Sequence, residues 1–154
     1  MTVRNASRGI VLASAIVAVS AGCPQGSSER PPSTDSRERL VLPAPDRDKV
    51  LLEMRQMLEA VDGIMQGLTK DDLAAVAEAA RGAGIAMAVD LDPAIRNQLP
   101  KNFIDLGMRT HQAFDELAES MNAGGTREDA IRGLAGLTGN CVGCHASYRL
   151  DEAR

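Results

Sequence analysis

The sequence predicts an all-α fold, an antiparallel four-helix bundle spanning residues 46–154. Three observations lead to this fold class. Apolar residues recur at spacings of three and four positions, as they do on one face of a helix. Aromatic residues are scarce, with no Trp, one Tyr and two Phe, so the core must come mainly from aliphatic residues, which suit helix packing better than a β-sandwich. Strand signals are nearly absent.

The first two predicted helices meet at a polar turn. The first runs from about Asp46, its expected N-cap, to Leu68. Its apolar stripe consists of Leu51, Met54, Leu58, Val61, Met65 and Leu68. Thr69, with an acidic residue three places on, has the form of the next N-cap. The second helix would then carry Leu73, Val76 and Ala80 on its inner side, followed less regularly by Ile85 and Met87.

The last two predicted helices follow a longer connection, which Pro93 and Pro100 punctuate. The apolar face of the third helix consists of Phe103, Leu106, Phe114, Leu117 and Met121. It should end at Gly124 and Gly125, since glycine favours helix C-termini. Thr126 and Asp129 predict the start of the fourth helix, whose inner positions would be Ile131, Leu134 and Leu137.

The fourth predicted helix contains the run CVGCH at residues 141–145, a C-x-x-C-H motif typical of c-type haem attachment. Each thiol can add across one haem vinyl group, and the two-residue gap matches the spacing of the two vinyls. The adjacent histidine then offers an imidazole nitrogen to the iron. The sequence therefore predicts one covalent haem c, held by Cys141 and Cys144 with His145 as the proximal ligand.

Two other uses of a C-x-x-C motif fit this sequence less well. A structural zinc site needs four nitrogen or sulfur ligands, and only Cys23 and His111 remain outside the motif. A thioredoxin-like dithiol should follow a strand within a βαβ unit, whereas helical sequence surrounds this motif.

Residues 1–22 have the features of a bacterial export signal. Arg4 and Arg8 precede a short apolar segment, residues 9–18, which is too short to span a bilayer. Small residues then lead to Cys23, which resembles the lipidated cysteine of bacterial lipoproteins. Ser20 departs from that pattern, so ordinary cleavage into the periplasm stays an alternative. We expect a periplasmic protein anchored to a membrane through Cys23.

Residues 23–45 are predicted to be a lipidated N-terminus followed by a disordered linker. Five of the seven prolines lie in this segment, together with many Ser, Arg and Glu residues. Such a composition buries too little apolar surface to offset the entropy lost on ordering. The formal net charge of −4 would become more negative after removal of the signal, which argues against nucleic acid as a partner.

A helical chain with C-x-x-C-H on its last helix resembles the cytochrome c′ and cytochrome c-556 family over residues 46–150. Class I cytochromes c, in contrast, carry the motif near the N-terminus. The resemblance implies that Tyr148 and Arg149 neighbour the haem on its proximal side, although Arg149 at an exposed helix end is the alternative. It also implies that Arg55, which precedes Gln56 as in the family, lies near a haem propionate.

The same resemblance implies electron transfer with an unidentified redox partner, or binding of a small gas such as NO or CO. The alternative is a haem enzyme with weak peroxidase-type activity, which would need a distal acid–base group. His111 is the spare histidine and shares a helical face with Gly107, Phe114 and Ala118. We expect it to be a structural or surface histidine and the protein not to be an enzyme.

In this family a residue of the first helix faces the sixth position of the iron. Aligning on the apolar stripe puts Leu58 there, with Met54 and Met57 as alternatives within one turn. Aligning on the arginine instead gives Glu59, which would bring an unpaired charge into a dry pocket. Because a leucine side chain has no lone pair to donate, Leu58 at this place predicts a five-coordinate iron. Family members often pair through their first two helices, and the wide apolar face of the first helix leaves a homodimer open.

Overall fold

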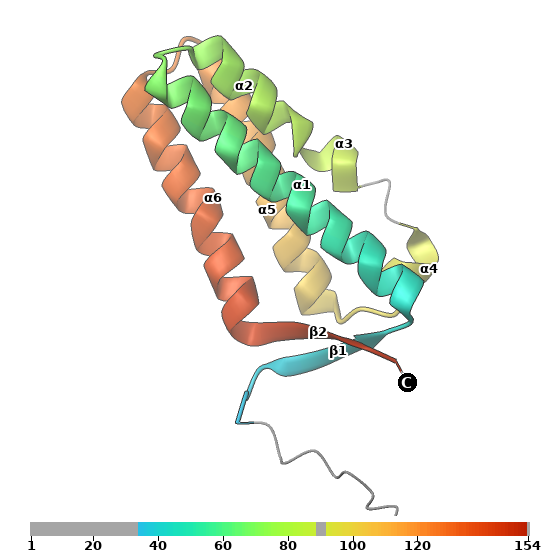
Figure 1. Ribbon diagram of the computed structural model, residues 1–154. Helices are drawn as coiled ribbons and strands as arrows, with labels where there is room; N and C mark the ends of the chain where they lie inside the picture. The colour runs from blue at the N-terminus through green and yellow to red at the C-terminus, as the bar shows by residue number, and fades with distance from the viewer. Residues whose placement is uncertain (1–33, 89–91, 154) are drawn as a thin grey trace, which may run out of the picture. The chain divides into compact units, whose positions relative to one another are not determined.

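The computed structural model describes residues 34–88 and 92–153. Residues 35–153 form a mostly helical unit with a small two-stranded parallel sheet (Figure 1). In chain order the elements are β1 (Glu38–Leu42), α1 (Ala44–Thr69), α2 (Leu73–Gly82), α3 (Ile85–Ala88), α4 (Pro93–Arg96), α5 (Lys101–Asn122), α6 (Arg127–Ser147) and β2 (Tyr148–Glu152). The predicted export signal and Cys23 lie outside the described residues.

Four of the helices pack as successive neighbours: α1 lies against α2, α2 against α5 and α5 against α6 (Figure 1). One core cluster lies among these four helices, and its largest fully buried side chains are Phe114, Ile64, Leu137 and Val76. By contrast, α1 and α6 touch only sparsely. None of the described helices is long and apolar enough to cross a membrane.

Two predicted helix starts have different outcomes. The capping box at Thr126 is confirmed, since its hydroxyl accepts from the Asp129 N–H and the Asp129 carboxylate accepts from the Thr126 N–H. The N-cap predicted at Thr69 is wrong. Thr69 ends α1, and Asp72 caps α2 by accepting from the Ala75 N–H. Between the two helices, Asp71 has a φ of 54°, in the left-handed region.

The predicted core stripe of α1 is only partly correct. Leu68 is buried, but Leu58 is 66% exposed and Met65 is 46% exposed, while Ile64 is fully buried. The reason is the close approach of α1 to α2, where a Cβ added at Gly67 would lie 2.8 Å from Cγ2 of Val76. Because α1 turns this glycine side to α2, none of the described elements fully covers Leu58 and Met65 on its apolar stripe.

Residues 38–42 correct the predicted linker, because they form the strand β1. It pairs in parallel with β2, with Glu38 opposite Tyr148 and Leu42 opposite Glu152. Leu40 and Leu42 are buried, whereas Val41 between them is half exposed, which is the alternation of a strand with one covered face. The covering residues include Val50, Ile95, Leu99 and Phe103. The end of the supposed linker therefore belongs to the folded unit.

Candidate functional site

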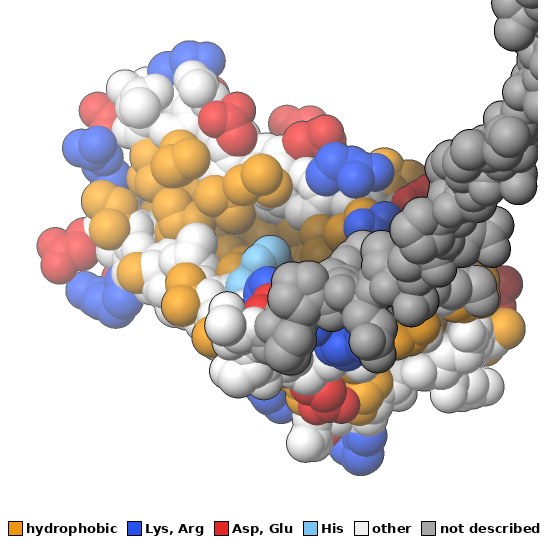
Figure 2. Space-filling view, turned by 60° about the horizontal axis from the view of Figure 1, so that its bottom comes forward, with side chains coloured by type: hydrophobic (Ala, Val, Ile, Leu, Met, Phe, Trp, Pro, Cys, Tyr) orange, Lys and Arg blue, Asp and Glu red, His pale blue; other side chains and the backbone are white. Residues whose placement is uncertain are grey.

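A cavity of about 460 Å³ separates α1 from α6, and α5 lies along it. This volume is typical of a site for a small molecule or cofactor. Figure 2 shows hydrophobic side chains gathered around a hollow on one face, with a histidine beside them. The apolar part of the lining consists of Val50, Leu51, Met54, Met57, Leu58, Val61, Ala88, Phe103, Ile104, Leu106, Met108 and Phe114.

All three motif residues expected to hold a haem line this cavity from α6. Cys141 and Cys144 are three positions apart, and His145 is four from Cys141, so the helix presents them on one face. Both thiols are free and half-buried, while His145 is exposed. The motif thus lies along one wall of the cavity, near the C-terminal end of α6.

The environment of the two thiols differs from that of a reactive dithiol. Burial raises the pKa of Cys141, and burial together with the neighbouring Cys141 raises the pKa of Cys144. Redox-active cysteines instead have lowered pKa values, for example at a helix N-terminus. These two lie in the last turns of α6. Within residues 34–88 and 92–153, no group of three or more His, Cys, Asp or Glu side chains is arranged to hold a metal ion.

The opposite wall comes from α1. Arg55, Leu58 and both alternative methionines, Met54 and Met57, contribute to the lining. Glu59 does not, and it borders a separate, polar depression next to α2. The sequence-predicted residues of α1 and α6 are therefore brought to opposite sides of one cavity. Because Leu58 is largely exposed, it lies where the cavity opens to solvent.

His111 lies on the α5 side of the cavity and is 1% exposed. Its Nδ1 is 2.7 Å from the carbonyl oxygen of Ala83, and its Nε2 is 2.9 Å from Oε1 of Glu53. A carbonyl oxygen can only accept, so Nδ1 carries a proton. Burial alone would lower the pKa of His111, but the hydrogen bonds to Glu53 and to the Ala83 carbonyl outweigh it and raise that pKa above its ordinary value.

Sequence reasoning missed Glu53 and Arg96. Glu53 was not connected with His111, because no local spacing relates residues of two helices that are 58 positions apart. Arg96, on the short helix α4, also lines the cavity and donates from Nη2 to the Ala88 carbonyl at 2.9 Å. The sequence next to Arg96 offers only the Asp92-Pro93 pair at the start of α4, which predicts a turn rather than a binding site.

Tyr148 and Arg149 were expected next to the haem, but neither is part of the cavity lining. Tyr148 packs edge-on against Phe103, with ring centroids 5.5 Å apart, and Phe103 does line the cavity. Nη1 of Arg149 lies 3.9 Å from the Asp35 carboxylate. Tyr148 thus supports the cavity wall from behind, and Arg149 belongs to the polar contacts around β1.

The lining of the cavity offers the chemical groups that a flat, mostly apolar macrocycle with two carboxylates would need. Its walls are predominantly aliphatic and aromatic, and the lining also offers two cations, Arg55 and Arg96. Thiols and an imidazole are present on one wall in the spacing that covalent attachment requires. Comparisons of this chain with protein-family models, with curated proteins and with solved structures found no match.

Proposed function

We propose that this protein is a c-type cytochrome that binds one covalent haem c and acts in periplasmic electron transfer or in binding a small gas. The observation that carries the proposal is the position of Cys141, Cys144 and His145 on one face of α6, along an apolar cavity of suitable size. A cavity filled by a cofactor also explains why α1 exposes apolar residues toward α6.

Each part of the lining has a role in this proposal. Cys141 and Cys144 would form the two thioether bonds, and His145 would ligate the iron. Arg55 and Arg96 would balance the charge of the propionates. The apolar wall of α1 and α5 would exclude water. The haem would supply an iron that changes its charge by one electron or takes up a diatomic ligand.

The finer architecture belongs to this proposal. The helices α1, α2, α5 and α6 would form the antiparallel four-helix bundle, with the haem along α6 as in cytochrome c′ and cytochrome c-556. Leu58 lines the cavity from α1 and has no lone pair to donate, which supports a five-coordinate iron open to gas. Export and a lipid on Cys23 complete the proposal, and mass spectrometry of the mature N-terminus tests that modification.

The alternative, a peroxidase-type enzyme, depends on His111. Both of its ring nitrogens have partners in Glu53 and Ala83, so neither is available to shuttle a proton to a bound ligand. This arrangement favours a structural histidine and a protein without enzymatic turnover. His111→Ala tests the choice, because a large change in peroxide reactivity would favour the enzyme.

The experiment for the main proposal is periplasmic expression with a haem-attachment system. We expect the wild-type protein to gain the mass of one haem, and its alkaline pyridine spectrum to show two saturated vinyl groups. Cys141→Ala and Cys144→Ala should each leave one vinyl unsaturated or abolish attachment. Ser147→Ala, an exposed position of the same helix, is the matched control and should load normally. A wild-type protein that gains no haem would refute the proposal.

A further inference from the structure

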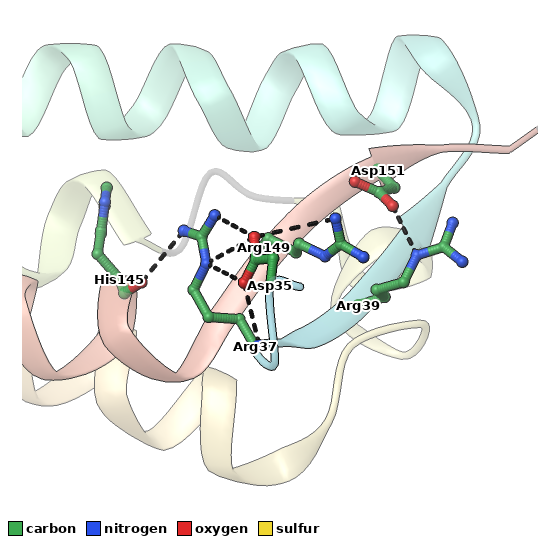
Figure 3. A network of polar contacts seen from close by, with 6 residues as sticks. All are labelled: Asp35, Arg37, Arg39, His145, Arg149 and Asp151. Carbon is green, nitrogen blue, oxygen red and sulfur yellow. Dashed lines mark hydrogen bonds and ion pairs between the residues drawn. The ribbon is translucent and has the colours of Figure 1, made fainter. Parts of the chain in front are cut away.

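The segment before β1 reaches the end of the helix that carries the motif. Nη1 of Arg37 donates to the backbone carbonyl oxygen of His145 at 3.2 Å, across 108 positions of sequence (Figure 3). The remaining donors of the same guanidinium face Asp35. Nε lies 2.9 Å from Oδ1 and Nη2 lies 2.7 Å from Oδ2 of that carboxylate. Asp35 thereby orients Arg37 so that its third nitrogen points at α6.

The carbonyl that Arg37 reaches would otherwise lack a partner within its helix. The last four carbonyls of a helix have no following N–H to accept from, and His145 is among the last four residues of α6. The Tyr148 N–H satisfies the carbonyl of Cys144, one residue earlier. A cation at this end also complements the partial negative charge of the helix terminus. Arg37 therefore caps the turn that bears His145.

The sheet fixes the place of this cap. Arg37 directly precedes β1, which is held by pairing with β2 and by the buried side chains of Leu40 and Leu42. A second ion pair, from Nε of Arg39 to Oδ2 of Asp151 at 2.6 Å, joins the two strands farther from α6 (Figure 3). The hydrogen bond of Arg37 holds the Asp35 carboxyl at a pKa well below its usual range, so its charge persists in mild acid.

From this geometry we infer that Arg37, oriented by Asp35, is a positioning residue for the axial histidine. Its bond to the His145 carbonyl keeps the last turn of α6 helical, and it thereby limits how far the imidazole can tilt or rotate. This inference rests on the proposed function, since it assigns Arg37 a role toward His145 as iron ligand. Arg37 itself would touch neither the haem nor the iron.

The test compares Arg37→Gln with Arg39→Gln in the haem-loaded protein. Both substitutions remove one cation from the same short segment, but only Arg37 contacts α6. We expect Arg37→Gln to shift or broaden the iron–histidine stretching band in the resonance Raman spectrum, and to increase amide hydrogen exchange at residues 144–147 by about threefold. Arg39→Gln should leave both unchanged. Arg37→Lys should keep the wild-type band and exchange rates only in part, because one ammonium cannot bind the Asp35 carboxylate and the His145 carbonyl in the same geometry as a guanidinium.

Two results would overturn the inference. The first is an iron–histidine band in Arg37→Gln that is identical to that of the wild type. The second is a shift of this band in Arg39→Gln as large as that in Arg37→Gln, which would indicate a general loss of order in the segment around β1. Asp35→Asn is a further variant, and it should shift the iron–histidine band in the same direction as Arg37→Gln but by a smaller amount. Failure of the proposed function would look different, since the wild-type protein would then carry no covalent haem at all.

Discussion

Nε2 of His111 lies 2.9 Å from Oε1 of Glu53, and the pair bridges α5 and α1 beside the cavity. The carbonyl of Ala83 holds the other ring nitrogen as a donor, so Nε2 faces the carboxylate. If neither partner carried a proton there, two lone pairs would confront each other in a buried site. The geometry therefore favours a retained proton, in agreement with the raised pKa of His111.

This pair predicts a pH-dependent stability. Because the pKa of His111 is higher in the folded protein than in the unfolded chain, the stabilisation is fully present below about pH 6.5 and is lost as pH rises through the folded value. Glu53→Gln should lower the free energy of unfolding near pH 6 by about 1.5–3 kcal/mol, the range for hydrogen bonds to charged groups, and by less at higher pH.

Urea denaturation across this pH range measures the effect. Glu59→Gln is the matched control, since Glu59 is an exposed acid on the same helix. Parallel pH profiles for the wild type and Glu53→Gln would contradict the prediction.

The strand β1 predicts a sharp contrast between neighbouring residues. Leu42 is 0% exposed and packs in the cluster that contains Phe103, whereas Val41 is 50% exposed. We expect Leu42→Ala to destabilise the protein by about 2–5 kcal/mol and Val41→Ala by at most about 0.5 kcal/mol. Thermal or urea unfolding measures both. Equal, small effects would mean that this segment is a linker after all.

A second contrast concerns the glycines at the end of α2. A Cβ at Gly84 would collide with the Asp115 carboxylate, which accepts from the Ile85 N–H and pairs with Arg81. Gly84→Ala should therefore cost about 1–3 kcal/mol. Gly82→Ala, which meets open space, should be neutral or stabilising by up to about 1 kcal/mol, since alanine favours helix. Urea unfolding of the two variants under one condition gives the comparison.

The proposed haem gives a spectroscopic prediction for the sixth position of its iron. Met54 and Met57 pack against core clusters, while Leu58 stands at the cavity opening. We expect the haem-loaded wild type to lack the long-wavelength ferric band of iron–methionine ligation, and Met54→Leu and Met57→Leu to leave its spectrum unchanged. Leu58→Met should introduce methionine ligation. A wild-type band that disappears in either methionine variant would show that Leu58 is not the facing residue.

The helices could be predicted from sequence because their signals are local. The spacing of three and four residues marked the long helices, and the capping box at Thr126 marked the start of α6 correctly. The stripe on α1 was harder to interpret, since periodicity reveals an apolar face but not what covers it. Ile64 is buried in the core cluster among the helices, whereas Leu58 on the same helix lines a cavity.

The strands and the Glu53–His111 pair could not be predicted, because they depend on contacts between residues that are remote in sequence. Segment ERLVL lies between a polar, proline-rich stretch and Pro43, so its composition resembles a linker. Its strand character depends on β2, which is remote in sequence and follows the motif helix directly. For the site, the motif alone identified the residues of α6 that line the cavity. The position of Arg96 beside the cavity depends on where α4 lies in the fold, which no sequence pattern indicated.

The parallel sheet joins the first and the last of the described elements, and 112 positions separate Arg39 from Asp151 within it. Contacts between such distant segments form late, because a long loop must close before any contact compensates its entropy. During synthesis, the motif cysteines therefore belong to a chain in which β1 and β2 have not yet paired. The haem attachment proposed above would at that stage reach both thiols freely, and the contact of Arg37 with the end of α6 would form only afterwards.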